Sequence, residues 1–183
     1  ALGMPTRDCS FTVTRQGDTR GTDTVDWSLT LPGSETTNEG NTNTSTWYQL
    51  DPSDISGVTT SNGTATFNAG AWTGTLTFED GETTKTISIS VASDLTVELD
   101  EGFTVTISNA KLSDNTPQNI VDATATGRIA NDDQRFSVSA ANAAIAEGNS
   151  GTTQVAYTVT RTGDLSVAAT VDYTVTGSNG ANT

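Results

Sequence analysis

Apolar and polar residues alternate along most of this chain, which is the pattern of strands that bury one face and expose the other. Turn-forming residues separate the alternating runs at 16–18, 79–82 and 131–133. No long run has the 3.6-residue period of an amphipathic helix. We therefore expect an all-β fold of two antiparallel sheets packed face to face. The apolar positions that define the runs are Val25, Trp27, Leu29, Leu76, Phe78, Ile87, Ile89, Val91, Phe103, Val105, Ile107, Ala125, Gly127 and Ile129.

Part of this pattern occurs twice in the chain. Residues 11–18 (FTVTRQGD) return as residues 157–164 (YTVTRTGD), 146 positions later. Residues 25–27 (VDW) return as residues 171–173 (VDY) at the same offset. Self-similarity at a fixed offset indicates an array of repeated units, each built from the same strands.

The phase of the repeat divides the chain into one nearly complete unit and one partial unit. We expect residues 1–133 to form a sandwich that lacks its first strand, because residues 136–146 have no counterpart ahead of residue 1. Residues 134–183 should begin a second unit, with a strand that begins at 136–139 and continues at 143–147 and two more strands at 155–161 and 168–175. The missing strand has two interpretations. Either the chain is a piece of a longer array, or subunits exchange the strand around 136–145 and build a fibre.

The segment at about 31–62 departs from the strand pattern, because it is polar and rich in Thr and Asn. We expect a long insertion with one short hairpin. Its apolar cluster is at 47–50 (WYQL). Trp47 and Tyr48 either fold back onto the sandwich, as satellite clusters under long loops do, or form a binding surface for carbohydrate or protein.

Composition indicates where the protein is located and which classes of partner it can bind. The 183 residues carry a net charge of -14, with a pI of about 4.1, so nucleic acid and anionic membranes are poor partners and neither is expected. No apolar run approaches the ~20 residues of a membrane span, so membrane insertion is not expected. A chain rich in Thr, Asn, Gly and Ser, and poor in Lys, indicates a bacterial protein that is extracellular or on the cell surface. Cys9 is the single cysteine, which excludes an internal disulfide.

Catalysis is not expected, and no residue is predicted to be catalytic. The sequence has no His and one Cys, which excludes zinc sites of the usual kind and His-based nucleophilic triads. Its acidic residues gather instead in turns at strand ends. One cluster, Asp94, Glu98, Asp100 and Glu101, follows the Ile87–Val91 run, and another, 131–133 (NDD), follows Ile129. Such clusters are either a site for a cation such as Ca²⁺, which takes six to eight oxygen ligands, or a solvated acidic rim.

Several of these segments, in order, resemble the Calx-beta domain family. They are residues 11–18, 25–27, 74–87 (GTLTFEDGETTKTI), 94–107 (DLTVELDEGFTVTI) and 129–133 (IANDD), with 146–148 (AEG) resembling the opening of another copy. The resemblance implies an immunoglobulin-like antiparallel β-sandwich of about seven strands. It also implies Ca²⁺ at one end, on Asp94, Glu98, Glu101, Asn131, Asp132 and Asp133. Weaker matches are Asn68, Asp100 and Glu147.

The resemblance also sets the expected strength and purpose of calcium binding. Asn68, Ser93 and Asn131 stand where calcium-sensing members carry acidic residues, so fewer ions or weaker binding are expected. We expect a structural or adhesive repeat module that extends or assembles a surface protein, with neighbouring copies of the repeat and a surface ligand as partners. The alternatives are a calcium-independent filament subunit held by exchanged strands and a binding module that uses the Trp47 loop.

Overall fold

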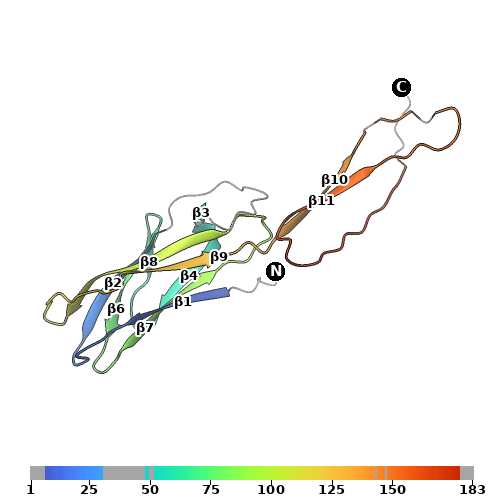
Figure 1. The fold of residues 1–183 in the computed structure, drawn as a ribbon. Helices are drawn as coiled ribbons and strands as arrows, with labels where there is room; N and C mark the ends of the chain where they lie inside the picture. The colour runs from blue at the N-terminus through green and yellow to red at the C-terminus, as the bar shows by residue number, and fades with distance from the viewer. Residues whose placement is uncertain (1–6, 31–47, 50–51, 143, 147, 178–183) are drawn as a thin grey trace.

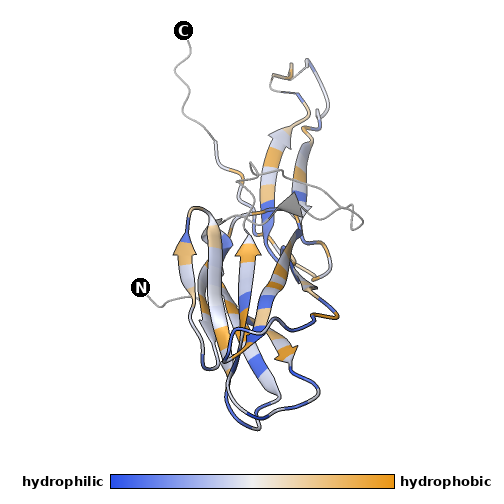
Figure 2. Cartoon of the chain, turned by 90° about the vertical axis from the view of Figure 1, so that its left-hand side faces the viewer, coloured by the Kyte–Doolittle hydropathy of each residue, from blue (hydrophilic) through white to orange (hydrophobic). Residues whose placement is uncertain are grey.

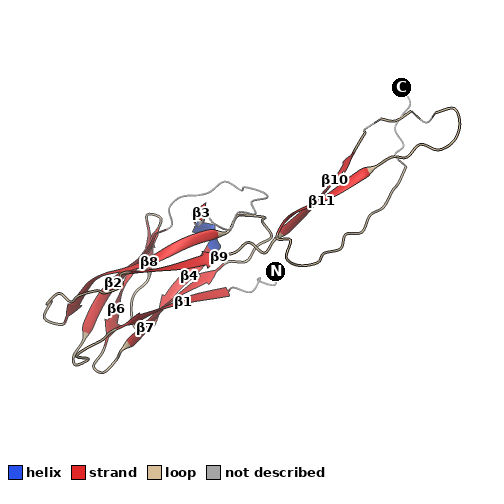
Figure 3. Ribbon diagram, viewed as in Figure 1, coloured by secondary structure: helices blue, strands red, loops and turns tan. Residues whose placement is uncertain are grey.

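The computed structural model describes residues 7–30, 48–49, 52–142, 144–146 and 148–177. Within these residues the regular structure is strand apart from a short 3₁₀ helix, η1 (Pro52–Asp54), so the expected all-β fold is confirmed (Figures 1 and 3). None of the described residues belongs to a helix long and apolar enough to cross a membrane. The strands are β1 (Arg7–Thr14), β2 (Asp23–Thr30), β3 (Tyr48–Gln49), β4 (Ile55–Thr60), β5 (Thr66–Asn68), β6 (Ala71–Phe78), β7 (Thr84–Val91), β8 (Glu101–Leu112), β9 (Thr124–Ile129), β10 (Gln134–Ala140) and β11 (Tyr157–Gly163).

Two sheets form the sandwich. One has the strand order β1-β7-β4, and the other has the order β3-β8-β2-β6-β5 with β9 also paired to β8. All of these pairs are antiparallel except β3–β8. The alternating apolar residues face the space between the sheets. The most deeply buried are at most 2% exposed: Trp27, Leu29, Leu76, Ile87 and Ile89. In Figure 2, hydrophobic residues appear as orange bands at intervals along the strands.

The core closes near β9 around the ring of Phe103. A Cβ atom at Gly127, the residue opposite Phe103 in the β8–β9 pair, would lie 2.3 Å from that ring. The ring therefore occupies the space that a side chain at position 127 would take. Phe11 packs edge-on against Phe103, with 5.8 Å between ring centroids and 71° between ring planes, which joins β1 to the opposite sheet.

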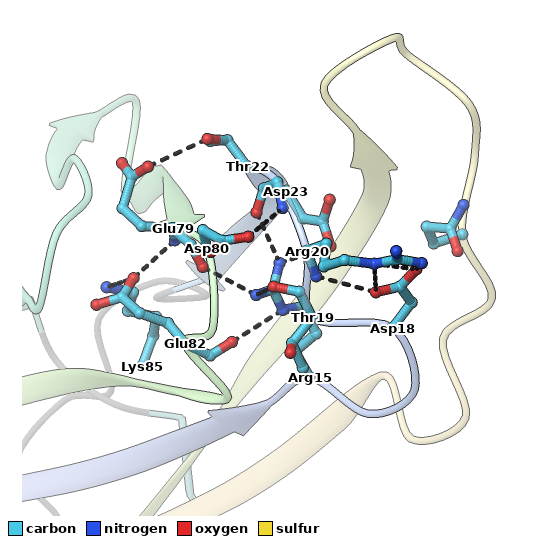
Figure 4. Close-up of polar contacts among 12 residues, drawn as sticks. Arg15, Asp18, Thr19, Arg20, Thr22, Asp23, Glu79, Asp80, Glu82 and Lys85 are labelled. Carbon is cyan, nitrogen blue, oxygen red and sulfur yellow. Dashed lines mark hydrogen bonds and ion pairs between the residues drawn. The ribbon is translucent and has the colours of Figure 1, made fainter.

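One end of the sandwich is held together by Arg15, which follows β1 (Figure 4). Its guanidinium donates to the carboxylate of Asp23 at 2.8 Å and lies 5.6 Å from the ring centroid of Phe78. It also donates to four main-chain oxygens, those of Thr19, Gly21, Glu79 and Glu82. The side chains of Arg15 and Asp23 are 9% and 13% exposed. We call this end of the sandwich the arginine end.

The segment expected to be an insertion is partly core. Residues 55–60 form β4, and Ile55 and Val58 are each 7% exposed. Their spacing of three hides the strand in the sequence, because the pairing of β4 with β7 shifts register between Ile55 and Gly57, as at a β-bulge. Residues 31–47 and 50–51, which include Trp47, lie outside the described residues, so the ligand-binding interpretation of that loop stays a prediction.

After the sandwich, β10 and β11 form an antiparallel hairpin. The expected strand at 168–175 is absent from the structure: these residues are described and have no strand partner, and a strand needs a neighbour to satisfy its main-chain groups. Val171 and Tyr173 are 50% and 86% exposed there. The strand expected at 143–147 is not formed by its described residues 144–146, and residues 143 and 147 lie outside the description.

Candidate metal site

The end of the sandwich opposite the arginine end holds a cavity of about 330 Å³. It forms where β7 and β9 end and where β1, β4 and β8 begin, because antiparallel neighbours bring these termini to one edge. We call it the acidic cavity after the side chains that line it. The acidic and amide residues among them are Asp8, Asp54, Asp94, Glu98, Glu101, Asn131, Asp132 and Asp133.

Three carboxylates converge most closely. Asp54, Asp94 and Glu98 each offer an oxygen, and these oxygens all lie within 4.8 Å of one another. Asp54 is 5% exposed, Glu98 is half-buried and Asp94 is exposed. Side chains that carry like charges at this spacing repel unless a cation or a proton lies among them.

Local packing places these three side chains. The main-chain oxygen of Asp54 accepts a hydrogen bond from the Ala92 amide at 2.7 Å, which ties η1 to the segment after β7. Asp94 caps its own turn, because its Oδ1 accepts from the Thr96 amide at 2.6 Å. Val97 and Leu99 are buried on either side of Glu98, and Glu98 and Leu99 both line the cavity.

Asn131 joins the two acidic segments that the sequence singles out. Its Oδ1 accepts from the Glu98 amide at 3.0 Å, and its Nδ2 donates to the Asp133 main-chain oxygen at 3.0 Å. The side chain predicted to be a ligand is thus engaged in positioning Glu98 and Asp133. It holds the 131–133 segment against the 94–101 segment.

The electrostatics of the cavity are unbalanced toward negative charge. Burial, together with the charges of Asp132 and Asp94, raises the pKa of Asp133. Asp132 forms an ion pair with Arg7 at 3.2 Å, but both side chains are mostly exposed, at 62% and 77%. A surface pair of this kind compensates little of the charge of the cluster.

Glu101 and Asp100 are neighbours in sequence with different surroundings. Glu101, at the start of β8, is 5% exposed and lines the cavity. Asp100 instead accepts from the Asn131 amide at 3.0 Å through Oδ1 and from the Arg128 guanidinium through Oδ2. It is not among the residues that line the cavity.

The structure brings together the whole main set of predicted ligands. Asp94, Glu98, Glu101, Asn131, Asp132 and Asp133 all line the acidic cavity. Among the weaker candidates, Asn68 lies in the edge strand β5, separated from β8 by β2 and β6, and does not line it. Glu147 lies outside the described residues.

Sequence reasoning missed Asp54, which belongs to the segment interpreted as an insertion. A signal was present, since Asp54 directly precedes the apolar positions Ile55 and Val58, as an acidic residue at a strand end. The bulge in β4 hid that strand, and with it the fact that β4 starts beside the end of β7.

The donor set suits a hard divalent cation. Seven lining residues carry carboxylates, and Arg7 and Arg128 also line the cavity. Oxygen ligands of this kind favour Ca²⁺ and Mg²⁺ over metals that prefer nitrogen or sulfur. The buried carboxylates of Asp54 and Glu101, together with the raised pKa of Asp133, mark a place where a bound cation would relieve unfavourable charge.

Residues 49–134 match the Calx-beta domain family. This segment is a Calx-beta domain. Among solved structures, the calcium binding domain CBD12 of CALX1.1 is similar to the chain, at 18% sequence identity and a TM-score of 0.41. The match covers 69% of this chain and 37% of that structure, so the chain spans little more than a third of the length of that protein. No curated protein matches the chain. The Calx-beta segment contains Asp54 and the six main predicted site residues.

Proposed function

We propose that this chain is a structural module whose Calx-beta domain binds Ca²⁺ in the acidic cavity and which extends or assembles a surface protein outside a bacterial cell. The observation that carries the proposal is the convergence of Asp54, Asp94 and Glu98, whose carboxylate oxygens lie within 4.8 Å of one another. The proposed role is binding and mechanical rather than catalytic. Neighbouring copies of the repeat are the proposed partners.

The residues that would hold the ion are those that line the cavity with carboxylates. Asp54, Asp94 and Glu98 form the centre, and Glu101, Asp132 and Asp133 lie around it. Bound there, a divalent cation supplies positive charge that neutralises these groups and links η1, the 92–100 segment and the 131–133 segment. Those segments connect both sheets, so their cross-linking stiffens one end of the sandwich.

The position of Asp133 supports a mechanical role. It lines the cavity, and its main-chain oxygen accepts from the amide of Asp164, the residue that follows β11, at 2.8 Å. It also directly precedes β10, the first strand of the second unit. A cation held at the cavity would therefore restrain the connection between successive units as well as the loops of the first.

Calcium-dependent unfolding tests the proposal. With free Ca²⁺ at a hundredfold excess over its dissociation constant, the free energy of unfolding should rise by about 2.7 kcal/mol relative to the protein in chelator. Glu98→Gln, which removes one central carboxylate without changing its size, should abolish most of that rise. Asp122→Asn makes the same charge change in the exposed β8–β9 loop and should leave the rise intact.

The outcome that overturns the calcium assignment is equal stability of the native sequence in millimolar Ca²⁺ and in chelator. A rise that survives Glu98→Gln unchanged would place the ion elsewhere. Mg²⁺ at the same concentration serves as the selectivity control, because its smaller, octahedral shell is built mostly from water.

A second candidate function is a calcium-independent filament subunit assembled by strand exchange. It is favoured by a separate observation: among the described strands, β1 pairs with β7 on one side and with none on the other. This candidate shares with the first the assembly of copies and differs in what holds them together.

A further inference from the structure

Strand β1 is at an edge of its sheet, and among the described strands it pairs with β7 alone. The Arg15 amide donates to the Thr83 main-chain oxygen at 2.8 Å, so main-chain groups of odd-numbered residues along β1 face β7. Those of the even-numbered residues, including Thr12 and Thr14, point away from β7. They form a ladder of donors and acceptors that we call the β1 edge.

The sandwich is incompletely covered beside the β1 edge. The inward side chains of β1, Phe11 and Val13, are only half-buried, whereas Ile87 and Ile89 in the neighbouring β7 are fully buried. Across the gap between the sheets, Ala125 of β9 lies opposite the buried Val105 and is itself exposed. One further strand beside β1 would cover this side of the core.

The second unit shows which strand fits such an edge. β11 (YTVTRTG) repeats the sequence of residues 11–17, and it pairs with β10. In that pair, Ala140 lies opposite Tyr157, Val138 opposite Val159 and Phe136 opposite Arg161. The first-unit equivalents of the three β11 residues are Phe11, Val13 and Arg15.

The hydrogen-bond phase of the two units agrees. The Ala156 main-chain oxygen accepts from the Ala141 amide at 3.0 Å, so even-numbered residues along β11 direct their main-chain groups toward β10. Thr158 and Thr160 are among them, and their equivalents are Thr12 and Thr14. The β1 edge therefore presents the same ladder that β10 already uses in the second unit.

We propose that the β1 edge accepts β10 of a second copy of this chain, antiparallel and in the register that β10 keeps with β11. Phe136, Val138 and Ala140 then lie beside Arg15, Val13 and Phe11 and face the core of the acceptor. The inference rests on the assembly part of the proposed function and is independent of the calcium site. Each copy offers one donor and one acceptor, so the contact is head-to-tail and builds a filament when it does not close.

The exchange favours the acceptor sandwich over the hairpin. In the hairpin, Val138 and Val159 are 68% and 51% exposed, and Tyr157 is 60% exposed. A two-stranded sheet with an uncovered apolar face is marginal in water, whereas β10 on the β1 edge becomes the fourth strand of a sheet that already has a core. Val138, which belongs to β10, gains cover by this move, and β11 of the donor gives up its pairing with β10.

The junction within the chain is a template for the proposed arrangement. Residues 130–133 lead directly from β9 into β10, and the Asp133 oxygen meets the Asp164 amide. Asp164 is the repeat equivalent of Asp18. In the proposed filament, the donor sandwich is therefore placed relative to the acceptor as the first unit is placed relative to the second. The main-chain oxygen of the donor's Asp133 then meets the amide of the acceptor's Asp18.

A disulfide trap tests the register and uses the one native cysteine. Continuing the register by two residues places Asn142 opposite Val155, whose equivalent in the first unit is Cys9. Directly opposite residues bring their Cβ atoms within the reach of a disulfide. Asn142→Cys, oxidised in the full chain, should give a ladder of disulfide-linked dimers and longer chains on a non-reducing gel. Burial raises the pKa of the Cys9 thiol, so the oxidation is run at alkaline pH.

Two controls define failure. Ala141→Cys places the thiol on the other face of the strand and should cross-link far less. The double variant Cys9→Ser with Asn142→Cys should lose the ladder and retain only dimers through position 142. Equal cross-linking in Ala141→Cys overturns the proposal. So does an absence of any cross-linked product from Asn142→Cys that depends on Cys9.

A second variant tests the edge without a new thiol. The Thr12 amide faces away from β7, so Thr12→Pro removes a donor from the β1 edge and should prevent self-association measured by sedimentation, while the β-sheet circular dichroism is retained. Thr12→Val keeps the amide and should still associate. Both variants are measured in Ca²⁺ and in chelator. If Ca²⁺ does not raise the free energy of unfolding but the disulfide-linked ladder still forms, the calcium site alone is rejected. If Ca²⁺ raises the free energy of unfolding but no ladder forms, strand addition alone is rejected.

Discussion

The two ends of this sandwich deal with charge in opposite ways. At the arginine end, the nearly buried guanidinium of Arg15 meets Asp23 and four main-chain oxygens, and the buried Lys85 pairs with Glu82 at 2.6 Å. At the other end, Asp54, Asp94 and Glu98 converge on one another. Each buried cation of the first end has its counter-charge in the chain. At the second end, the proposed cation would supply counter-charge from outside the chain.

The difference separates two kinds of stability. Contacts at the arginine end are part of the fold under all conditions in which the groups are ionised. If the acidic end binds a cation as proposed, it contributes in full only with that cation bound, because like charges at this spacing repel. On this proposal, the module folds without the ligand, and the end that leads into β10 stiffens when the ligand binds.

The largest test of the comparison removes the internal counter-charge. Arg15→Ala leaves the carboxylate of Asp23 and several main-chain oxygens without their donor, and breaking a largely buried pair costs about 3 kcal/mol or more. The free energy of unfolding, from urea titration, should fall by that amount with or without Ca²⁺. Arg20→Ala is the matched control, since Arg20 pairs with Asp18 on the surface, and it should leave the midpoint unchanged. An Arg15 variant as stable as the native chain would show that the arginine end is not a structural centre.

The next test removes part of the acidic end. Asp54→Asn keeps the size of the side chain and the main-chain bond to Ala92 but lowers the charge of the buried carboxylate to zero. We expect it to abolish the calcium-induced gain of about 2.7 kcal/mol at a hundredfold excess of ligand. Without Ca²⁺ the variant should be at least as stable as the native chain, because one repulsive charge is gone. Calorimetric titration with Ca²⁺ measures the first effect and urea unfolding in chelator the second. A variant that binds Ca²⁺ normally would remove Asp54 from the site.

Periodicity predicted the sheets because the positions that decide them are local. Val25, Trp27 and Leu29, or Ile87 and Ile89, show which face is buried without any knowledge of the partner strand. The strand at 55–60 could not be found in this way, since its bulge replaces a spacing of two by a spacing of three. The segment 168–175 shows the opposite failure. Its alternation is strand-like, but pairing decides whether a strand forms, and no partner is present among the described residues.

Residues of the candidate site could be predicted from the sequence where they follow strands that could themselves be predicted. Glu98 and Asp133 follow strands that the alternation identifies, so their meeting at one edge could be argued from sequence. The place of Asp54 in the site depends on the pairing of β4 with β7, which only the structure shows. The engagement of Asn131 with the Glu98 amide, and of Asp100 with Arg128, also depends on side-chain direction and could not be inferred from spacing.

A smaller effect is expected from Asp133, where burial and two neighbouring carboxylates raise the pKa. Asp133→Asn removes this charge and keeps the main-chain oxygen that Asn131 and Asp164 use. In chelator the variant should be more stable than the native chain by less than about 1 kcal/mol, the scale of one exposed charge–charge interaction. In Ca²⁺ it should lose part of the calcium gain. Urea midpoints of the variant and the native chain, compared in chelator and in Ca²⁺, show whether the variant is the more stable in the first buffer and the less stable in the second. A variant that is less stable in both buffers would contradict the account of the acidic end.

The smallest and sharpest test is the pH dependence of the metal-free protein, because the two ends titrate with opposite signs. The pKa of Asp133 is raised, so its contribution to stability is complete below the ordinary Asp value and is lost as pH rises through the folded value. The pKa of Glu82 is lowered, first by the hydrogen bond from Lys85 and then by the Glu79 amide, so its contribution is present above the ordinary Glu value and is lost as pH falls through the folded value.

Lowering the pH from neutral in chelator should therefore first raise the urea midpoint, as Asp133 takes up a proton, and then lower it, as Glu82 does. Asp133→Asn should remove the rise and keep the fall, and Glu82→Gln should weaken the fall and keep the rise. Saturating Ca²⁺ should suppress the rise in the native chain, because a bound cation holds the carboxylates of the acidic cavity in their charged form. If the midpoint in chelator instead falls steadily from neutral pH, protonation brings no relief at the acidic end, and its carboxylates are already compensated within the chain.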